Sequence, residues 1–347
     1  MRFRVWLVFA MGLVCAQAHA QDFHFSQFYV SPMLQNPANA GFFNCSYRFT
    51  GIYRNQWRSV GVPYKTFAGS LDMRFIGKRG NKDIGGVGAV FFSDKAGDPD
   101  MSHSGAMVAG AYHKNIDKDR AGVNYLGGGA MLGFAGGSLD YMKLRFSDQY
   151  LSPGNVSLVS MEPGVSSFNY IDMSAGIEYN WIPESKNNHV QVGVAMFHIN
   201  RPDKTFRNDG TSELPRKLVA HASGQARLNA HLELFPKLQL ARQAKRMETQ
   251  FGSLVRLDLD KMKNDYYGVY LGAFGRIVGD HSNAAAADAV ILMTRLDVKE
   301  LSLAFSYDVN LSLLRYASES RGGPEFSIIY IGCLARGNPK GVYCPRF

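Results

Sequence analysis

Residues 190–196 read Val190-Gln191-Val192-Gly193-Val194-Ala195-Met196, and this stretch decides the fold class. Large apolar side chains occupy every second position, with polar or small residues between them. A period of two places the two sets on opposite faces of a β-strand. The same alternation recurs in residues 255–260 and 301–309. Such segments, separated by polar or Gly/Pro/Asn/Asp turns, predict an all-β protein.

The second face of these segments decides between a soluble sandwich and a membrane barrel. Its small, glycine-rich and charged residues cannot form the packed interior of a soluble sandwich of this size, so we expect that face to be wet. After the first twenty residues, no run approaches the roughly eighteen apolar residues of a membrane-spanning helix, which excludes a helical inner-membrane protein. The pattern fits a transmembrane antiparallel β-barrel with an apolar outside and a water-filled lumen, in the bacterial outer membrane.

The alternation predicts about 14 strands, an even number as expected for a single-chain bacterial barrel. Residues 138–146 alternate weakly, and we assign them to a long connection that runs to about residue 168. The predicted strands are 46–57, 65–75, 85–94, 103–114, 123–135, 169–181, 189–200, 217–228, 231–241, 249–260, 266–277, 288–297, 300–309 and 324–333.

The first twenty residues have the features of a secretory signal peptide. Arg2 and Arg4 precede an apolar run, and Ala18-His19-Ala20 suits cleavage before Gln21. A lipid anchor on Cys15 is the alternative, but no small residue stands immediately before it. Because Arg2 and Arg4 are the only charged residues of 1–20, removing the peptide lowers the formal net charge from +9 to +7. The remaining basic residues are scattered, which argues against nucleic acid as a partner of an exported protein.

The mature chain is predicted to contain an N-terminal periplasmic or plug-like segment at 21–45, a barrel at 46–333 and a C-terminal tail at 334–347. Its cysteines are Cys45, Cys333 and Cys344, in a compartment where disulfides persist. Cys333 and Cys344 are close enough in sequence to staple the tail, with Cys45 then left over or paired instead.

Ordered motifs occur along the mature chain at 21–29, 36–41, 53–57, 93–97, 193–202, 305–309 and 322–327. Together they make the mature chain resemble the PorP/SprF family of Bacteroidetes membrane proteins. Pro324 departs from the pattern, because similar proteins often carry a His before the Glu, and the Cys333–Cys344 tail is longer. The resemblance implies an outer-membrane barrel that works with the type IX secretion apparatus or with a large secreted adhesin, in gliding motility or adhesion.

The segment at 21–45 is too polar and too rich in Pro and Asn for a strand, yet it contains the aromatic cluster Phe23, Phe25, Phe28 and Tyr29. One hypothesis is a periplasmic segment or a plug on the barrel mouth, which makes these residues candidates for partner binding. The alternative is a tail that caps the first strand.

Arg54, Gln56 and Arg58 share one face of the first strand, opposite Tyr53 and Trp57. They point into the lumen if the aromatic pair meets lipid. We expect lumenal ion pairs that rigidify the barrel, with Asp258 and Asp260 as candidate partners, in preference to a ligand-gripping role.

No catalytic signature is present: the sequence lacks a Gly-x-Ser-x-Gly elbow, a phosphate-binding loop and a His-Glu-x-x-His motif. The histidines form no close metal-ligand pair, so we expect neither metal nor cofactor and no enzymatic activity. The glycines of 127–129 and 136–137 suit close backbone approach or bends in a barrel wall. The predicted function is therefore an interaction protein of type IX secretion, with a passive porin-like channel as the alternative and a membrane hydrolase as the weakest hypothesis.

Overall fold

The computed structural model describes a barrel and the segment that precedes it in the chain. The predicted signal peptide and the predicted tail lie outside the described residues. These residues are 22–58, 61–76, 83–97, 100–116, 123–144, 146, 149–152, 155–156, 164–183, 188–206, 212–229, 231–258, 267–280, 283–312 and 315–333.

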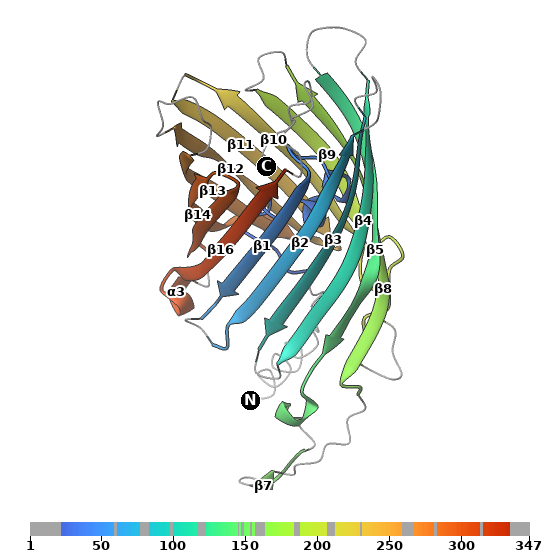
Figure 1. Ribbon diagram of the computed structural model, residues 1–347. Coiled ribbons are helices and arrows are strands. Elements are labelled where there is room, and N and C mark those ends of the chain that lie inside the picture. The colour runs from blue at the N-terminus through green and yellow to red at the C-terminus, as the bar shows by residue number, and fades with distance from the viewer. Residues whose placement is uncertain are drawn as a thin grey trace.

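Fourteen antiparallel strands of this described part form one closed barrel, which confirms the predicted architecture (Figure 1). Each strand pairs with its neighbours in chain order, and β16 closes the barrel on β1. The strands are β1 (Tyr47–Gln56), β2 (Tyr64–Ile76), β3 (Ile84–Ala96), β4 (Met101–Asn115), β5 (Val123–Ser138), β8 (Ser167–Ile182), β9 (His189–Phe197), β10 (Lys217–Arg227), β11 (Leu232–Gln243), β12 (Arg246–Asp258), β13 (Tyr267–Asp280), β14 (Asn283–Val298), β15 (Leu301–Asn310) and β16 (Arg321–Gly332).

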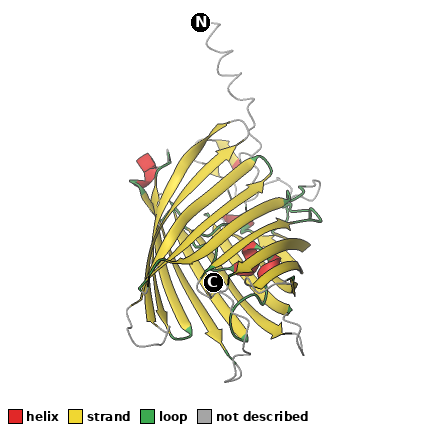
Figure 2. Ribbon diagram, turned by 90° about the horizontal axis from the view of Figure 1, so that it is seen from above, coloured by secondary structure: helices red, strands yellow, loops and turns green. Residues whose placement is uncertain are grey.

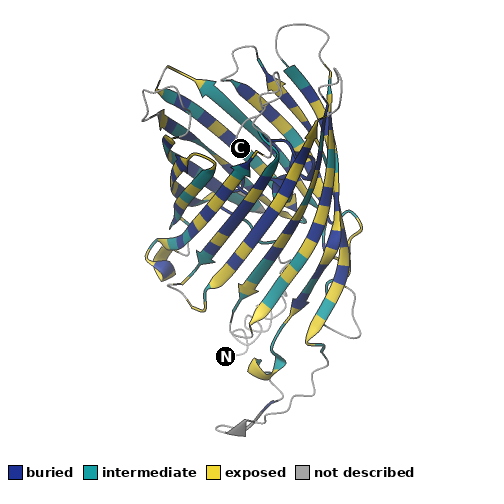
Figure 3. Ribbon diagram, viewed as in Figure 1, coloured by how far each residue is buried: buried dark blue, intermediate teal, exposed yellow. Residues whose placement is uncertain are grey.

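Burial alternates along the wall as the sequence predicts (Figure 3). On β9, Val192 and Val194 are 41% and 43% exposed, whereas Gln191 and Ala195 are buried. On β1, Tyr53 faces outward and Arg54 is buried. The apolar set therefore forms the outside of the barrel, where lipid solvates it, and the polar set lines the interior.

The connection between β5 and β8 contains only short elements among the residues that the structure describes. Residues 138–146 form no separate strand: Ser138 ends β5, and a 3-10 turn, η2 (Tyr141–Lys143), follows. Two short strands, β6 (Tyr150–Ser152) and β7 (Asn155–Val156), pair with each other outside the barrel sheet. We call this end of the barrel, where β1 finishes and the β5–β8 and β9–β10 connections lie, the loop end.

Residues 22–43, here called the plug, lie inside the barrel. They form two short helical turns, α2 (Pro32–Gln35) and η1 (Pro37–Asn39), which Figure 2 shows among the strands. Most plug residues are buried, and η1 contacts β4, β5 and β8. The expectation of a lumen filled by water is thus corrected: the inner polar face is satisfied in large part by a segment of the same chain.

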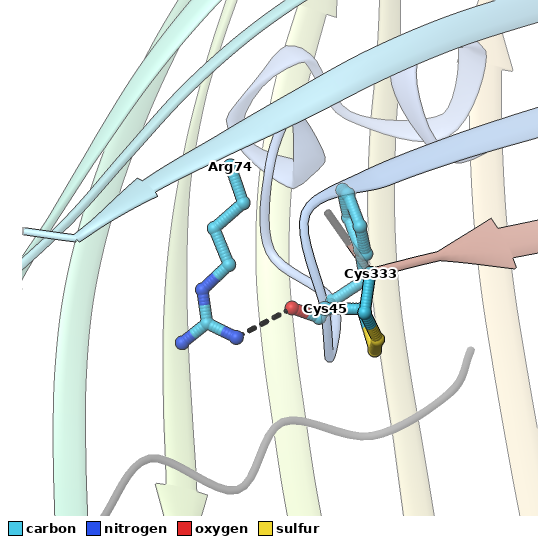
Figure 4. Close-up of a disulfide and its surroundings, with 4 residues drawn as sticks. Cys45, Arg74 and Cys333 are labelled. Atoms are coloured by element: carbon cyan, nitrogen blue, oxygen red, sulfur yellow. Dashed lines mark hydrogen bonds between the residues drawn. A yellow bond between two sulfur atoms is a disulfide. The ribbon is translucent and has the colours of Figure 1, made fainter. Parts of the chain in front are cut away.

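The plug ends at the opposite end of the barrel, where a disulfide joins Cys45 to Cys333 with a Cα–Cα distance of 4.7 Å (Figure 4). The predicted Cys333–Cys344 bridge is therefore wrong, and Cys344 lies outside the described residues. The physical reason is barrel closure. Tyr47 pairs with Gly332 across the seam between β1 and β16, which brings the flanking cysteines together although 288 positions separate them. We call this the disulfide end.

One further helical turn, α3 (Arg315–Ser318), lies between β15 and β16. None of the helices within the described ranges is long and apolar enough to cross a membrane.

Candidate functional site

The plug is held by two carboxylates of the wall, which lie two and four residues from the loop ends of β15 and β16. The backbone N–H groups of Ser26 and Gln27 donate to the two carboxylate oxygens of Glu325, at 2.9 and 2.6 Å. The Ser26 hydroxyl donates to Asp308 at 2.7 Å. Hydrogen bonds between backbone N–H groups and a carboxylate are charge-assisted, so they fix the chain more firmly than neutral ones.

Two buried arginines neutralise these carboxylates. Arg54 of β1 lies 2.8 Å from Asp308 and 3.8 Å from Glu325, and it also donates to the His24 carbonyl. Arg276 of β13 lies 2.9 Å from Asp308. Arg276 also lies 2.6 Å from Asp288. We call Arg54, Arg276, Asp288, Asp308 and Glu325 the central anchor.

The predicted lumenal position of Arg54 agrees with this geometry, but its partners differ from the expected ones. Arg54 pairs with Asp308 and Glu325, so the predicted pairing with Asp258 and Asp260 is replaced. Asp260 and the side chain of Asp258 lie outside the described residues. No local pattern distinguishes among the lumenal carboxylates, because the partner strands are remote from β1 along the chain.

A second anchor holds the plug near the disulfide end. Asp72 accepts from the Gly41 N–H at 2.8 Å and forms an ion pair with Arg48 at 2.8 Å. Arg48 in turn donates to the Asn39 carbonyl at 3.2 Å. Arg74 donates to the Phe43 carbonyl at 2.7 Å, beside the disulfide (Figure 4). The arginines thus satisfy backbone carbonyls of a segment that has no strand partner.

Two glycines of the wall let the plug backbone approach closely. A Cβ on Gly86 of β3 would lie 1.9 Å from the Ala40 carbonyl oxygen, and a Cβ on Gly129 of β5 would lie 2.7 Å from Ala38 Cα. Neither distance is compatible with a side chain. The sequence analysis offered two explanations for the glycines of 127–129, close backbone approach or a bend in the wall. Gly129 shows close backbone approach.

At the loop end the plug begins with a charged contact. His198 follows β9, and its two ring nitrogens lie 2.7 Å from Asp22 and 2.9 Å from Asp172. Burial lowers the pKa of His198, but Asp22 and Asp172 outweigh it and raise the pKa to about 9. Burial raises the pKa of Asp22, but His198 and Lys217 outweigh it and hold this pKa below the usual range of an aspartate. The pair is therefore ionised at neutral pH.

A cavity of about 80 Å³ lies between the plug and the wall near this contact. The plug contributes Phe23, Phe28 and Leu34, and the wall contributes Met107 and Tyr170, among others. The lining is mainly apolar and includes residues from several strands. Its volume is below the roughly 150 Å³ that holds a benzene ring, so it has room for a small side chain.

The structure places the predicted site residues at different depths. Phe25, Phe28 and Tyr29 are buried in the lumenal core, and Phe23 is half-buried at the cavity. Arg54 belongs to the central anchor, Gln56 is half-buried at the end of β1, and Arg58 is exposed beyond the strand. The aromatic cluster and Arg54 are brought together by the plug, whereas Arg58 lies outside this arrangement.

Asp308, Glu325 and Arg276 were not singled out as site residues by the sequence argument. One signal was available, because Asp308 and Glu325 lie within the motifs at 305–309 and 322–327 and alternate with apolar residues. A carboxylate on the inner face of a membrane strand requires a partner. The partner could not be assigned without the registers of the closed barrel.

The family model for "Type IX secretion system membrane protein PorP/SprF" matches residues 17–330, which include the plug and nearly the whole barrel. The chain belongs to the PorP/SprF family. With its closed barrel and apolar outer face, this PorP/SprF protein spans the bacterial outer membrane.

Solved structures with a similar fold are outer-membrane barrels of low sequence identity. A mutant of the TodX monoaromatic hydrocarbon channel is 9% identical, with a TM-score of 0.46, and the match covers 86% of this chain and 91% of that one. A Pseudomonas aeruginosa FadL homologue is 11% identical, with a TM-score of 0.46 and coverage of 85% and 92%. The Ralstonia pickettii toluene transporter TbuX is 12% identical, with a TM-score of 0.44 and coverage of 90% and 94%. A search of curated proteins gave no significant match.

Proposed function

We propose that this PorP/SprF protein is a non-enzymatic interaction component of type IX secretion. It supports the secretion or surface anchoring of a large adhesin by binding the adhesin's C-terminal region or the secretion machinery. The family membership carries this proposal, because it assigns the chain to a secretion pathway.

The occupied lumen supports an interaction role over a passive solute channel. The plug is fixed to the wall at the central anchor, near the disulfide end and at the loop end, by buried polar contacts. Removing one partner of a buried ion pair leaves an uncompensated charge, so the plug does not leave the lumen without a large cost. A segment held in this way opposes a wide aqueous pore.

The loop end is where we expect the partner to bind. It combines the half-buried Phe23, the small apolar cavity and the exposed Arg58. An apolar side chain of a partner segment fits the volume of the cavity, and the surrounding polar residues supply hydrogen bonds at its rim.

The test is a deletion strain whose surface proteins are labelled with a membrane-impermeant biotin reagent and identified by mass spectrometry. The proposal expects one or more large secreted proteins to disappear from the cell surface and to return on complementation. Complementation with a Phe23→Asp variant tests the loop end, with Arg321→Gln as the control because Arg321 is exposed and does not line the cavity. Unchanged surface display in the deletion strain contradicts the proposal.

The channel alternative is tested on the purified protein in planar bilayers, beside a general porin. The plugged barrel is expected to give no stable open conductance. A steady conductance of porin size favours the channel.

A further inference from the structure

A basic groove of about 520 Å³ lies on the outer surface of the wall at the loop end. It extends from the β9–β10 connection to the β11–β12 turn. Its lining consists of Arg201, Glu213, Pro215, Arg216, Leu218, Arg242 and Ala244. None of these residues belongs to the plug, so the groove is separate from the lumenal site.

The groove faces lipid and not the lumen. Leu218 is 44% exposed and points outward, while its neighbour Val219 is buried inside. In the sheet, Leu218 pairs with Met196 of β9 and with Arg242 of β11. Met247 of β12 pairs with Arg242 on the other side. Arg242 therefore stands in a row of outward apolar side chains at the edge of the lipid-facing surface.

The β9–β10 connection places two further arginines beside this row. The connection folds back on itself, with a bridge between Asp203 and Glu213 and a hydrogen bond from the Leu214 N–H to the Pro202 carbonyl. The Arg216 guanidinium donates to the Ile199 carbonyl at 3.0 Å, which holds it close to the wall. The fold of the connection thus brings Arg201 and Arg216 to the same groove as Arg242.

The groove carries an excess of positive charge. Three guanidinium groups stand against one carboxylate, Glu213, which lies 3.6 Å from Arg201. Arginines at the boundary of an apolar band extend their side chains toward the headgroup layer, where lipid phosphates lie. A planar guanidinium binds a phosphate through two parallel hydrogen bonds, and several together hold it with both charge and geometry.

We propose that this groove binds the phosphate group of a membrane lipid, with the acyl chains of the lipid on Leu218, Met196 and Met247. The lipid fixes the β9–β10 connection against the membrane surface. This inference does not depend on the secretion role of the protein, because it rests on the outer wall and its charge.

The experiment is a titration of the full-length mature protein, in a nonionic detergent, with dioleoylphosphatidylglycerol, followed by native mass spectrometry. The double variant Arg216→Gln/Arg242→Gln is expected to bind the lipid about thirtyfold more weakly than the wild type, because each arginine near a lipid surface contributes about 1 kcal/mol. Arg321→Gln is the matched control, since this arginine is exposed at the same end but lies on β16, and it is expected to bind as the wild type does.

Equal binding by the double variant and the wild type overturns the proposal. Displacement of the lipid by inorganic phosphate at equal concentration overturns the assignment to a lipid, because it indicates a site for free phosphate. If the double variant fails to fold, the exposed Arg216→Gln single variant decides, with an expected loss of about fivefold on the same scale. An unchanged affinity in that variant counts against the groove.

Discussion

The plug is attached at the central anchor and at the loop end in physically different ways. The central anchor is almost completely buried, with Arg54, Asp308 and Glu325 at 1%, 2% and 0% exposure. The loop-end contact is also buried, with His198 at 7% and Asp172 at 1% exposure, but it depends on a histidine, which can lose its charge in an accessible pH range. A network of arginines and carboxylates fixes one position at a high cost of disruption, whereas a contact that depends on one titratable histidine can be weakened by a change of pH.

Breaking the central anchor should have the largest effect. Asp308→Ala removes the carboxylate that faces Arg54, Arg276 and the Ser26 hydroxyl, and leaves two buried guanidinium groups with fewer partners. The expected loss in free energy of unfolding is about 3–5 kcal/mol, as for other buried ion pairs that lose one member. Urea unfolding monitored by tryptophan fluorescence measures it. Glu319→Ala, at an exposed ion pair, is the control and should change stability little.

Loss of the disulfide should lower the free energy of unfolding somewhat less than loss of the central anchor. Cys45→Ser removes the bridge to Cys333, and the expected cost is about 2–4 kcal/mol because the bond restricts the unfolded chain. The same unfolding assay measures the change. Cys344→Ser is expected to leave stability unchanged; a loss in Cys344→Ser together with unchanged stability in Cys45→Ser argues for the pairing of Cys333 with Cys344.

A methyl group between plug and wall should have an intermediate effect. Gly86→Ala places a Cβ against the Ala40 carbonyl, where nothing but backbone can move. Overpacking of this kind costs about 1–3 kcal/mol, and we expect it to displace the plug toward the loop end. Limited proteolysis of residues 22–43, with mass spectrometry of the fragments, detects the displacement. Gly110→Ala is the matched control, since a Cβ there meets nothing within 4 Å.

The loop-end contact should show the smallest effect, and one that depends on pH. A histidine whose pKa is raised from 6.5 to about 9 stabilises the folded state fully below pH 6.5, and this contribution is lost as the pH rises through 9. The groups around it are Asp22, Asp172 and Lys217. Hydrogen exchange at residues 22–24 should therefore increase, beyond its intrinsic pH dependence, between pH 7 and 10 in the wild type. A His198→Gln variant should lack this transition, and its persistence there contradicts the assignment.

The sequence predicted the strands of the barrel wall well, because the alternation that indicates a strand lies within a few adjacent residues. Alternation along a strand depends on which neighbours face lipid, so the outward Val192 and the inward Arg54 follow from a few adjacent residues. The strand ranges depended on the same local pattern.

The sequence could not predict how the lumen is filled, because that depends on contacts between remote residues. Ser26 meets Glu325 only after the barrel has closed, and no local pattern indicates this pair. The disulfide was within reach, since closure of a barrel places the first strand beside the last and Cys45 and Cys333 flank those strands. Proximity in the sequence favoured Cys344 as the partner of Cys333 instead. Such proximity is a poor guide in a closed barrel, because the last strand pairs with the first.

The most direct test of the proposed function is an affinity pulldown of the tagged mature protein from native outer membranes in mild detergent, with mass spectrometry of the proteins that accompany it. An untagged strain and a tagged, unrelated outer-membrane barrel provide the background. The account predicts recovery of a large secreted adhesin or of type IX secretion components. Recovery of the barrel alone, from membranes in which those proteins are present, contradicts it.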